Sequence, residues 1–584
     1  MCGIIGYNGK GNSIPLILEG IKNLEYRGYD SFGCAFQSKS NGIEIRKNAG
    51  RISKIIEDYG IDKEVSSKGI AHTRWATHGG VTRENAHPLM DCSGKIAVAH
   101  NGIIENFAEL KNGLSSHKFV SGTDTEVLPH SIEDEMANGK SFEEAVISTA
   151  DRIKGFSSFV AMNSNSDNII AVKNGSPLVL GVKDNGVFVS SDVPSFLRHT
   201  KKVVYLFDGD VIAIGRNGFK VLKSRHMGKH KVREVNFSAT ESGKGKYRHF
   251  MLKEIAEQQK LVSALAESDL SYLKAPAAAV AASKKIYLVG SGTSFNVAQL
   301  TANIFRDIGK EALAVQPQDI YNYSKVIRKD DTFFIISQSG ETMDIIEALP
   351  LIKENKKIGI INTEGSTLAG AVDYLVNVNA GHEKGVAATK TFTMSAILSF
   401  LIAMFSAGEE KEAVDDLNLL SINIYNLFVP SVYAAVKNAA AKLKKEKNLF
   451  FLGRGNDYIS AMEAALKMKE ITYIHSEAID SATFKHGPLA LISRDVYSVA
   501  LVSERFKDKE INNLKEVKAR DGKIIGIANE NMDVFDAFIR SQPAGIFSFI
   551  PQVIISQMLA YYISVSKRID PDHPRNLAKA VTTK

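Results

Sequence analysis

Short apolar runs alternate with glycine and asparagine turns over residues 1–225. Clear examples are residues 95–106, 157–175, 186–195 and 202–222. Alternation of this kind is typical of half-buried antiparallel strands. Residues 13–24 and 124–137 have the spacing of helices instead. We therefore expect a first domain at 1–225 that combines antiparallel strands with a few helices.

The pattern changes after residue 247, where helical segments alternate with β-rich runs that end in small residues. Residues 284–296, 331–344 and 356–367 each indicate a strand, a tight loop and the start of a helix. This order predicts βαβ units with a parallel sheet.

The same pattern then occurs a second time. Residues 447–460 resemble 284–296, 495–506 resemble 331–342, and 522–530 resemble 356–364. A long internal repeat predicts two similar domains in tandem. We therefore predict α/β domains at 247–425 and 426–565, a polar linker at 226–246 and a C-terminal tail at 566–584.

Two long uncharged segments, 391–408 and 541–566, have the length of membrane spans. The first contains serines and threonines, and the second contains prolines and glutamines. We interpret both as buried core helices and expect no membrane partner. No signal peptide is evident at the N-terminus, so we expect a cytoplasmic protein.

Composition adds few constraints, because 44% hydrophobic and 23% charged residues are ordinary for a globular protein. The three cysteines, Cys2, Cys34 and Cys92, show no CxxC spacing, so neither a disulfide scaffold nor a structural zinc site is expected. The net charge of +7 suits small anionic substrates as well as nucleic acid. The basic linker has no interleaved aromatic residues, so we expect no nucleic-acid partner. Residues 290–296 lack the GxGxxG glycines of a dinucleotide site, and we expect no metal and no cofactor.

Hydroxyl-rich loops follow two predicted strands of the first α/β domain. Hydroxyls and backbone N–H groups at the start of a helix suit a phosphate. Simple tight turns would also use serine and glycine. The second copy has Leu501, Val502, Ser503 and Glu504 in place of Ser337–Gly340, so we expect it to have lost phosphate binding. The candidate phosphate ligands are Ser291, Thr293, Ser294, Ser337, Gln338, Ser339 and Thr342.

Cys2 becomes the first residue if Met1 is removed, as its small side chain leads us to expect. One residue would then carry a nucleophilic thiol and an α-amine that can act as a general base. Alone, a cysteine at position 2 would mean little. The segments that accompany it are CGIIGY, LEYRGYDSFG, HTRWATHGG, NAHP, HNGIIEN and SGTDTEV.

Together these segments resemble the glutaminase domain of N-terminal-nucleophile amidotransferases. The resemblance implies an αββα sandwich in which Cys2 is the nucleophile, with Arg27 close to it. It implies that Arg74 and Asp124 bind the carboxylate and amine of glutamine, with Thr77 and His78 on a loop that closes over it. Asn101 and Gly102 would form the oxyanion hole, and Trp75 would gate an ammonia channel.

The C-terminal segments GSGTS, SQSGET, GVAATK, ALKMKEITYIHSEA, KHGPLALI and PRNLAK resemble one group of amidotransferases. They are similar to the glutamine–fructose-6-phosphate aminotransferase family, whose doubled domain is a pair of SIS domains. The resemblance implies Glu470 as isomerisation base, Lys467 as its partner and His486 as ring-opening acid/base. It implies Lys579 as Schiff-base lysine, and backbone contacts of Val386 and Ala388 with the sugar. His486 would come from a neighbouring subunit, so a homodimer with a shared sugar site is expected.

The expected reaction converts L-glutamine and fructose 6-phosphate to L-glutamate and glucosamine 6-phosphate, with ammonia passed inside the protein. By spacing alone, Lys467 and Glu470 would be a surface ion pair on one helix face. Two departures from the family's pattern affect the sugar site, Ala388 where serine is frequent and the segment SATFKHGP around His486. The alternatives are a sugar-phosphate-binding regulator without catalysis and an enzyme acting on another sugar phosphate or working as a deglycase.

Overall fold

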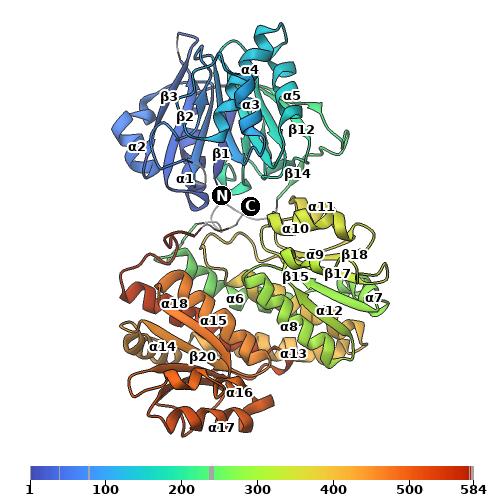
Figure 1. Cartoon of the computed structure of the whole chain (residues 1–584), viewed down its shortest axis with the longest axis vertical. Helices are drawn as coiled ribbons and strands as arrows, with labels where there is room; N and C mark the ends of the chain where they lie inside the picture. The colour runs from blue at the N-terminus through green and yellow to red at the C-terminus, as the bar shows by residue number, and fades with distance from the viewer. Residues whose placement is uncertain (1, 39, 76–78, 236–242, 578, 580–584) are drawn as a thin grey trace. The chain divides into compact units, whose positions relative to one another are not determined.

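The computed structural model describes residues 2–38, 40–75, 79–235, 243–577 and 579. The chain divides into two compact units. The N-terminal unit contains residues 1–243, 365–367 and 578–584, and the C-terminal unit contains residues 244–364 and 368–577. Each unit is described by itself below (Figure 1).

Two antiparallel sheets form the centre of the N-terminal unit. The eight-stranded sheet has the order β14-β11-β9-β10-β1-β4-β2-β3, and the six-stranded sheet has the order β13-β12-β8-β7-β6-β5. The strands are β1 Gly3–Gly9, β2 Ser31–Gln37, β3 Ile43–Ala49, β4 Lys68–Arg74, β5 Leu89–Met90, β6 Ile96–Gly102, β7 Ser157–Asn163, β8 Ile169–Lys173, β9 Val179–Lys183, β10 Gly186–Ser190, β11 Lys202–Tyr205, β12 Asp210–Gly215, β13 Gly218–Lys223 and β14 Arg233–Glu234.

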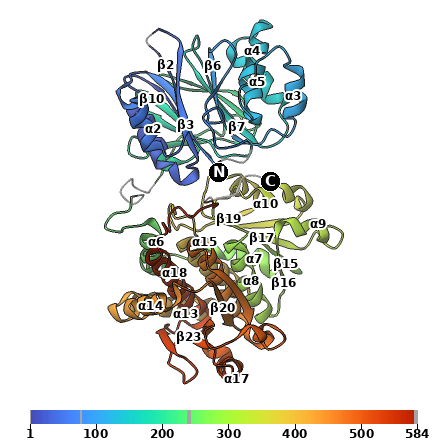
Figure 2. The same ribbon diagram turned by 60° about the vertical axis from the view of Figure 1, so that its left-hand side comes forward.

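Helices cover both outer faces of this sandwich (Figure 2). An apolar cluster between the sheets joins residues such as Ile4 and Ile70 to Val160 and Ile212. Each sheet also packs against its own helices through one further apolar cluster. The unit is therefore an αββα sandwich with the expected antiparallel strands. The helices are α1 Ile14–Asn23 and α2 Ile52–Tyr59 on one face, and α3 Phe107–Gly113, α4 Val127–Ala137 and α5 Phe142–Arg152 on the other.

Two five-stranded parallel sheets form the C-terminal unit. Their orders are β16-β15-β17-β18-β19 and β21-β20-β22-β23-β24. In each sheet, the strand that comes first in the sequence of that copy lies between the second and the third strand. The shared strand order confirms the internal repeat. The strands are β15 Lys285–Val289, β16 Glu311–Val315, β17 Thr332–Ser337, β18 Lys356–Ile361, β19 Tyr374–Asn377, β20 Asn448–Gly453, β21 His475–Asp480, β22 Tyr497–Val502, β23 Lys523–Ala528 and β24 Ala537–Arg540.

One large apolar core joins the two copies through their long helices. The helices are α6 Phe250–Ala266, α7 Lys274–Ala281, α8 Thr293–Asp307, α9 Ile320–Tyr323, α10 Met343–Ala348, α11 Thr367–Ala371, α12 Lys390–Ser406, α13 Glu410–Asn423, α14 Pro430–Leu443, α15 Asn456–Thr472, α16 Ser481–Phe484, α17 Lys507–Lys518 and α18 Phe549–Ser566. Helix α12 is buried from Lys390 to Phe405. In the apolar 18-residue stretch within Gly545–Ser566, a segment that contains α18, 83% of the residues are buried. Both are core helices, as expected.

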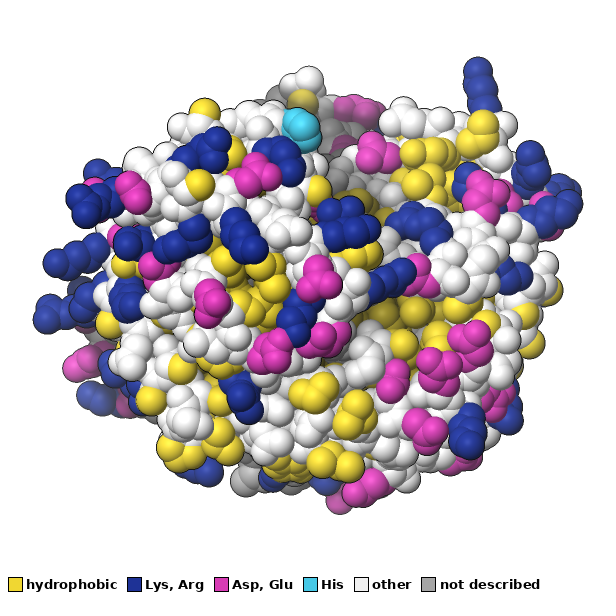
Figure 3. Space-filling model, turned by 90° about the horizontal axis from the view of Figure 1, so that it is seen from below, with side chains coloured by type: hydrophobic (Ala, Val, Ile, Leu, Met, Phe, Trp, Pro, Cys, Tyr) yellow, Lys and Arg dark blue, Asp and Glu magenta, His cyan; other side chains and the backbone are white. Residues whose placement is uncertain are grey.

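Charged side chains are mixed on the face of the C-terminal unit seen in Figure 3. Basic and acidic groups alternate there rather than forming a single basic patch. A mixed surface produces no focused field for a polyanion.

Candidate functional site

The pairing of β1 with β4 places Cys2 beside Trp75. The register sets Gly3 opposite Thr73, so residue 2 lies next to the end of β4. The Trp75 N–H donates to Cys2 Sγ at 3.3 Å, and the thiol lies 3.6 Å from Trp75 O. The Cys2 carbonyl accepts hydrogen bonds from Arg27 Nε at 3.3 Å and from Asn101 Nδ2 at 3.2 Å. Three of the predicted glutaminase residues therefore contact Cys2 directly.

Arg74 and Asp124 are both buried, at 4% and 7% exposure. Burial lowers the pKa of Arg74, and the charges of Cys2, Asp30 and Asp124 act in the opposite direction. Arg74 Nη1 donates to Gly80 O at 3.2 Å, while Asp124 Oδ2 accepts the Ile104 N–H at 2.8 Å. Arg74 thus interacts electrostatically with both Cys2 and Asp124, and this buried cation and anion are the two charges that a zwitterionic amino acid requires. Thr77 and His78 lie outside the described residues.

Gly102 has a conformation that only glycine adopts readily. Its φ is +127°, and a Cβ there would lie 2.0 Å from Phe156 O. The close pairing of β6 with β7, in which Gly102 faces Ser157, causes this contact. The adjacent Asn101 Nδ2 donates to Ser191 Oγ at 3.0 Å as well as to the Cys2 carbonyl. The predicted oxyanion residues are therefore rigid and lie beside the nucleophile.

Three buried histidines support this region, and the sequence did not single them out. His72 Nε2 lies 3.1 Å from Asn101 Oδ1, and the rings of His72 and His87 are 4.4 Å apart. Burial lowers the pKa of His72 to about 3, and it also lowers the pKa values of His87 and His100. A neutral His72 that donates from Nε2 fixes the orientation of the Asn101 amide. His72 and His100 lie in β4 and β6, His87 lies in the loop before β5, and no spacing of the three along the sequence indicates this role.

The hydroxyl-rich loops of the first α/β copy follow β15 and β17. Gly292, with φ +55°, ends the first loop and α8 starts at Thr293. Ser291 Oγ is buried and has no hydrogen-bond partner among the described residues. In the second loop, Ser337 Oγ accepts the Gly340 N–H at 3.0 Å and lies 2.9 Å from Thr342 Oγ1. Donors at the carboxyl ends of two parallel strands can bind an anion such as a phosphate.

A buried charged network on α15 reaches the first of these loops. Lys467 Nζ lies 2.6 Å from Glu470 Oε2 and 3.4 Å from Glu463 Oε1. It also donates to Thr293 Oγ1 at 3.1 Å. Burial alone would lower the pKa of Lys467, but the two carboxylates outweigh burial and raise it. Since the Lys467 side chain is only 1% exposed, the expectation of a surface ion pair is wrong.

Two carboxylates hold the loop that contains Val386 and Ala388. Glu254 Oε1 accepts the Lys384 N–H at 2.6 Å, and Glu383 Oε1 accepts the Thr389 N–H at 2.9 Å. This loop leads directly into α12. His486 instead follows α16 and is exposed. Lys579 belongs to the N-terminal unit by its contacts and is partly buried.

Comparison with known proteins gives matches in both units. Residues 72–198 match the glutamine amidotransferase domain family, and residues 280–406 and 442–538 match the SIS domain family. A solved C-terminal domain of glucosamine-fructose-6-phosphate aminotransferase from Francisella tularensis is 30% identical. The match covers 57% of this chain and 100% of the Francisella domain, with a TM-score of 0.53.

Two curated relatives match over their whole length. Glutamine–fructose-6-phosphate aminotransferase (isomerizing) of Thermococcus kodakarensis is 38% identical over 602 residues, and the protein of the same name from Clostridium tetani is 37% identical over 609 residues. In both comparisons all of this chain and all of the relative are covered. The chain therefore belongs to the family of isomerizing glutamine–fructose-6-phosphate aminotransferases.

Proposed function

We propose that this chain converts fructose 6-phosphate and L-glutamine to glucosamine 6-phosphate and L-glutamate. Cys2 attacks the glutamine amide, forms a thioester and releases ammonia, and water then releases glutamate. Arg74 binds the glutamine carboxylate and Asp124 its amine, with Thr77 and His78 on the closing loop. Support comes from the electrostatic interactions of the buried Arg74 with Cys2 and with Asp124.

Asn101 and Gly102 stabilise the tetrahedral intermediate. The intermediate carries an oxyanion, which preorganised donors stabilise. His72 supports this role because it holds the Asn101 amide in one orientation.

The sugar half opens, aminates and isomerises fructose 6-phosphate. The phosphate binds at Thr293, Ser294, Ser337, Gln338, Ser339 and Thr342. Val386 and Ala388 contact the sugar through the backbone. Glu470 moves the proton between C1 and C2, and Lys467 stabilises the charge that develops. The hydrogen bond from Lys467 to Thr293 supports this arrangement, since it links the base to the phosphate loop.

The remaining assignments concern transfer and assembly. Lys579 forms the Schiff base with the open sugar, and Trp75 gates the path of ammonia, which water would protonate at neutral pH. His486 acts in a neighbouring subunit's site, so the working form is a homodimer. Its exposure supports this assignment. We infer that the enzyme works in the cytoplasm.

One observation carries the proposal: a single chain combines an N-terminal thiol beside Arg74 with a buried Lys467–Glu470 pair at a hydroxyl-rich loop. A two-product assay tests it. Purified protein is mixed with glutamine and fructose 6-phosphate, and glutamate and glucosamine 6-phosphate are quantified with each substrate omitted in turn. Equal yields, with glutamate release stimulated by the sugar, are expected. Glutamate alone would contradict the sugar half, and binding of the sugar phosphate without product would favour a regulator.

A further inference from the structure

Four side chains with metal-binding atoms converge in the N-terminal unit, away from the residues assigned above. Cys92 lies in the turn between β5 and β6, His117 follows α3, and His130 and Glu133 lie one turn apart on α4. Their ligand atoms all lie within 4.8 Å of one another. The sequence had led us to expect no structural zinc site, because only the spacing of cysteines was considered.

Four of the six distances between these ligand atoms are close to the edges of a zinc tetrahedron. Bonds of about 2.3 Å to sulfur and about 2.0 Å to nitrogen or oxygen give edges of about 3.6 Å for S···N and about 3.3 Å for N···O. Cys92 Sγ lies 3.5 Å from His117 Nδ1 and 3.7 Å from His130 Nδ1. Glu133 Oε2 lies 3.1 Å from the former nitrogen and 3.6 Å from the latter.

Each ring nitrogen of His117 faces an acidic side chain. His117 Nε2 lies 2.7 Å from Asp134 Oδ1, so this ring nitrogen carries its proton toward that carboxylate. In a neutral ring, His117 Nδ1 then presents a lone pair to Glu133 Oε2 and to Cys92 Sγ. A metal ion bound between His117 Nδ1 and Glu133 Oε2, which lie 3.1 Å apart, would take a lone pair from each.

The surroundings orient these side chains as outer-shell groups do in metal sites. Asp134 holds the His117 ring in one tautomer. Glu133 accepts the Cys92 N–H at 3.0 Å, and the Lys118 N–H donates to Cys92 Sγ at 3.4 Å. Backbone donors to a sulfur stabilise its thiolate form, which is the form that binds metal.

We propose that Cys92, His117, His130 and Glu133 bind one zinc ion in a closed tetrahedral site. One thiolate and two imidazoles favour zinc over magnesium or calcium, which prefer oxygen ligands. Four protein ligands leave no open position, so the site is structural rather than catalytic.

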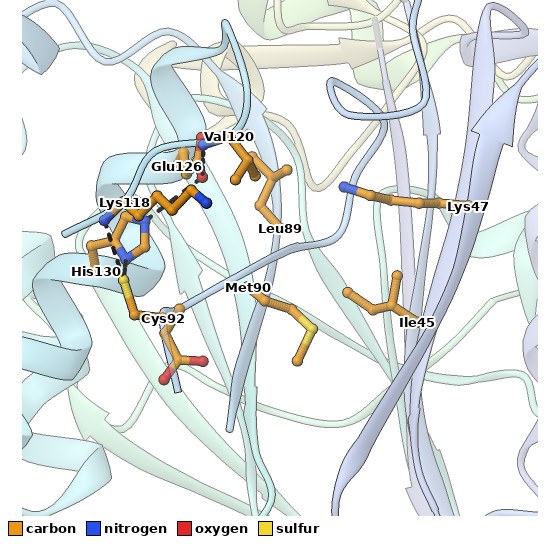
Figure 4. Close-up of a pocket in the computed structure, with 10 residues that line it drawn as sticks. Ile45, Lys47, Leu89, Met90, Cys92, Lys118, Val120, Glu126 and His130 are labelled. Atoms are coloured by element: carbon orange, nitrogen blue, oxygen red, sulfur yellow. Dashed lines mark hydrogen bonds and ion pairs between the residues drawn. The ribbon is translucent and has the colours of Figure 1, made fainter. Parts of the chain in front are cut away.

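Zinc at this place would tie the segment before Asp124 to α4. Glu126 Oε1 lies 3.7 Å from His130 Nε2, and its two oxygens accept the backbone N–H groups of Val120 and Ser121 at 2.8 and 2.7 Å. A metal ion that fixes His130 would therefore lie close to the carboxylate that holds Val120 and Ser121. Cys92 and His130 also line a cavity of about 350 Å³, through which an ion can enter (Figure 4).

Metal content and cobalt substitution test this proposal without any use of enzyme activity. Untagged full-length protein is purified without chelators, and its zinc is measured by elemental mass spectrometry. We expect one zinc per chain. After chelation and reloading with Co²⁺, we expect the visible bands of tetrahedral cobalt and a near-ultraviolet thiolate-to-cobalt charge-transfer band. No zinc and no cobalt spectrum in the wild-type protein would overturn the proposal.

Variants of each cysteine identify the thiolate. Cys92→Ser should lose the charge-transfer band, whereas Cys2→Ala and Cys34→Ala should keep it. A band that persists in Cys92→Ser, or that disappears in Cys2→Ala or Cys34→Ala, would contradict the assignment.

A milder variant covers the case in which Cys92→Ser does not fold. Asp134→Asn keeps all four ligands but weakens the hold on His117, and we expect about 10–100-fold weaker zinc binding. Zinc should also raise the Tm of chelated wild-type protein. Unchanged affinity in Asp134→Asn together with no Tm response would overturn the structural role.

Discussion

The two α/β copies have the same strand order but differ in what occupies the loop after the first strand. Gly292 and Gly455 take the same backbone turn in both, with φ of +55° and +60°. In the first copy Ser294 follows this turn, and the residue at the matching place in the second copy is Asp457. An identical scaffold therefore presents a hydroxyl in one copy and a carboxylate in the other.

The carboxylate of the second copy takes the donors that an anionic ligand would need. Asp457 Oδ2 accepts both the N–H and the hydroxyl of Ser503, each at 2.8 Å. Burial raises the pKa of Asp457 to about 6, and the hydrogen bonds from Ser503 oppose this shift. A fixed internal anion fills the loop and repels a phosphate. The sequence predicts that phosphate binding was lost in this copy, and the buried Asp457 carboxylate is a physical reason to expect that loss.

The second copy nevertheless contributes to the site of the first. Its helix α15 carries Lys467 and Glu463, and both contact Thr293 of the first copy. Asn296 donates a further hydrogen bond to Glu463 at 2.7 Å. The loss of phosphate binding predicted for the second copy and the catalytic groups proposed on the same copy are therefore separate properties.

Substitution of the proposed base tests this contribution most strongly. Glu470→Gln keeps the shape of the side chain but cannot take up a proton. We expect glucosamine 6-phosphate formation to fall about 10²–10⁴-fold. Glutamate release should persist, because it belongs to the other unit. The exposed Glu412→Gln on α13 serves as control, and equal loss in both variants would refute the role of Glu470.

Removal of a loop hydroxyl should weaken sugar-phosphate binding in the first copy but not in the second. Ser337→Ala removes a hydroxyl from the proposed phosphate site, and a hydrogen bond to a charged group contributes about 1.5–3 kcal/mol. We expect the KM for fructose 6-phosphate to rise about 10–100-fold. Ser503→Ala in the corresponding loop of the second copy should leave this KM unchanged. Equal effects in steady-state kinetics would show that the copies do not differ as proposed.

The internal carboxylate predicts a dependence of stability on pH. The pKa of Asp457 rises from 3.8 to about 6 on folding. The contribution of this group to the stability of the folded state is therefore most favourable below pH 3.8, where the carboxyl is protonated in both the folded and the unfolded state. Its contribution declines as the pH rises to about 6 and stays constant above it. Asp457→Asn should therefore raise the free energy of unfolding by about 1–2 kcal/mol at pH 8 and leave it almost unchanged at pH 4.

Denaturant unfolding at the two pH values measures this difference. The exposed Asp533→Asn is the control and should behave as the wild type at both. A destabilised Asp457→Asn at pH 8 would mean that its bonds with Ser503 outweigh the cost of burial.

A smaller effect distinguishes the two glycine turns. Both have positive φ, so alanine is strained at either position. At Gly455 a Cβ would also lie 2.7 Å from Phe506, whereas no atom lies within 4 Å of one at Gly292. We expect Gly455→Ala to be about 1 kcal/mol less stable than Gly292→Ala. Thermal unfolding of the two variants checks this, and equal Tm values would contradict it.

Local patterns predicted much of this protein. Alternation and strand–loop–helix order indicated the antiparallel domain and the two parallel copies, because periodicity reports which face of an element is buried. Short motifs that resemble those of the family singled out Cys2, Arg74, Asp124, Lys467 and Glu470 as candidate site residues. These features depend on neighbours in the sequence.

Only the tertiary structure decided which distant groups meet. The pairing of β1 with β4 brings Cys2 to Trp75, and helix packing buries Lys467 that spacing alone would have left exposed. Cys92, His117, His130 and Glu133 come from three separate segments with no diagnostic spacing. Strand register and helix packing over long separations determine such contacts, and a single sequence contains no local signal of them.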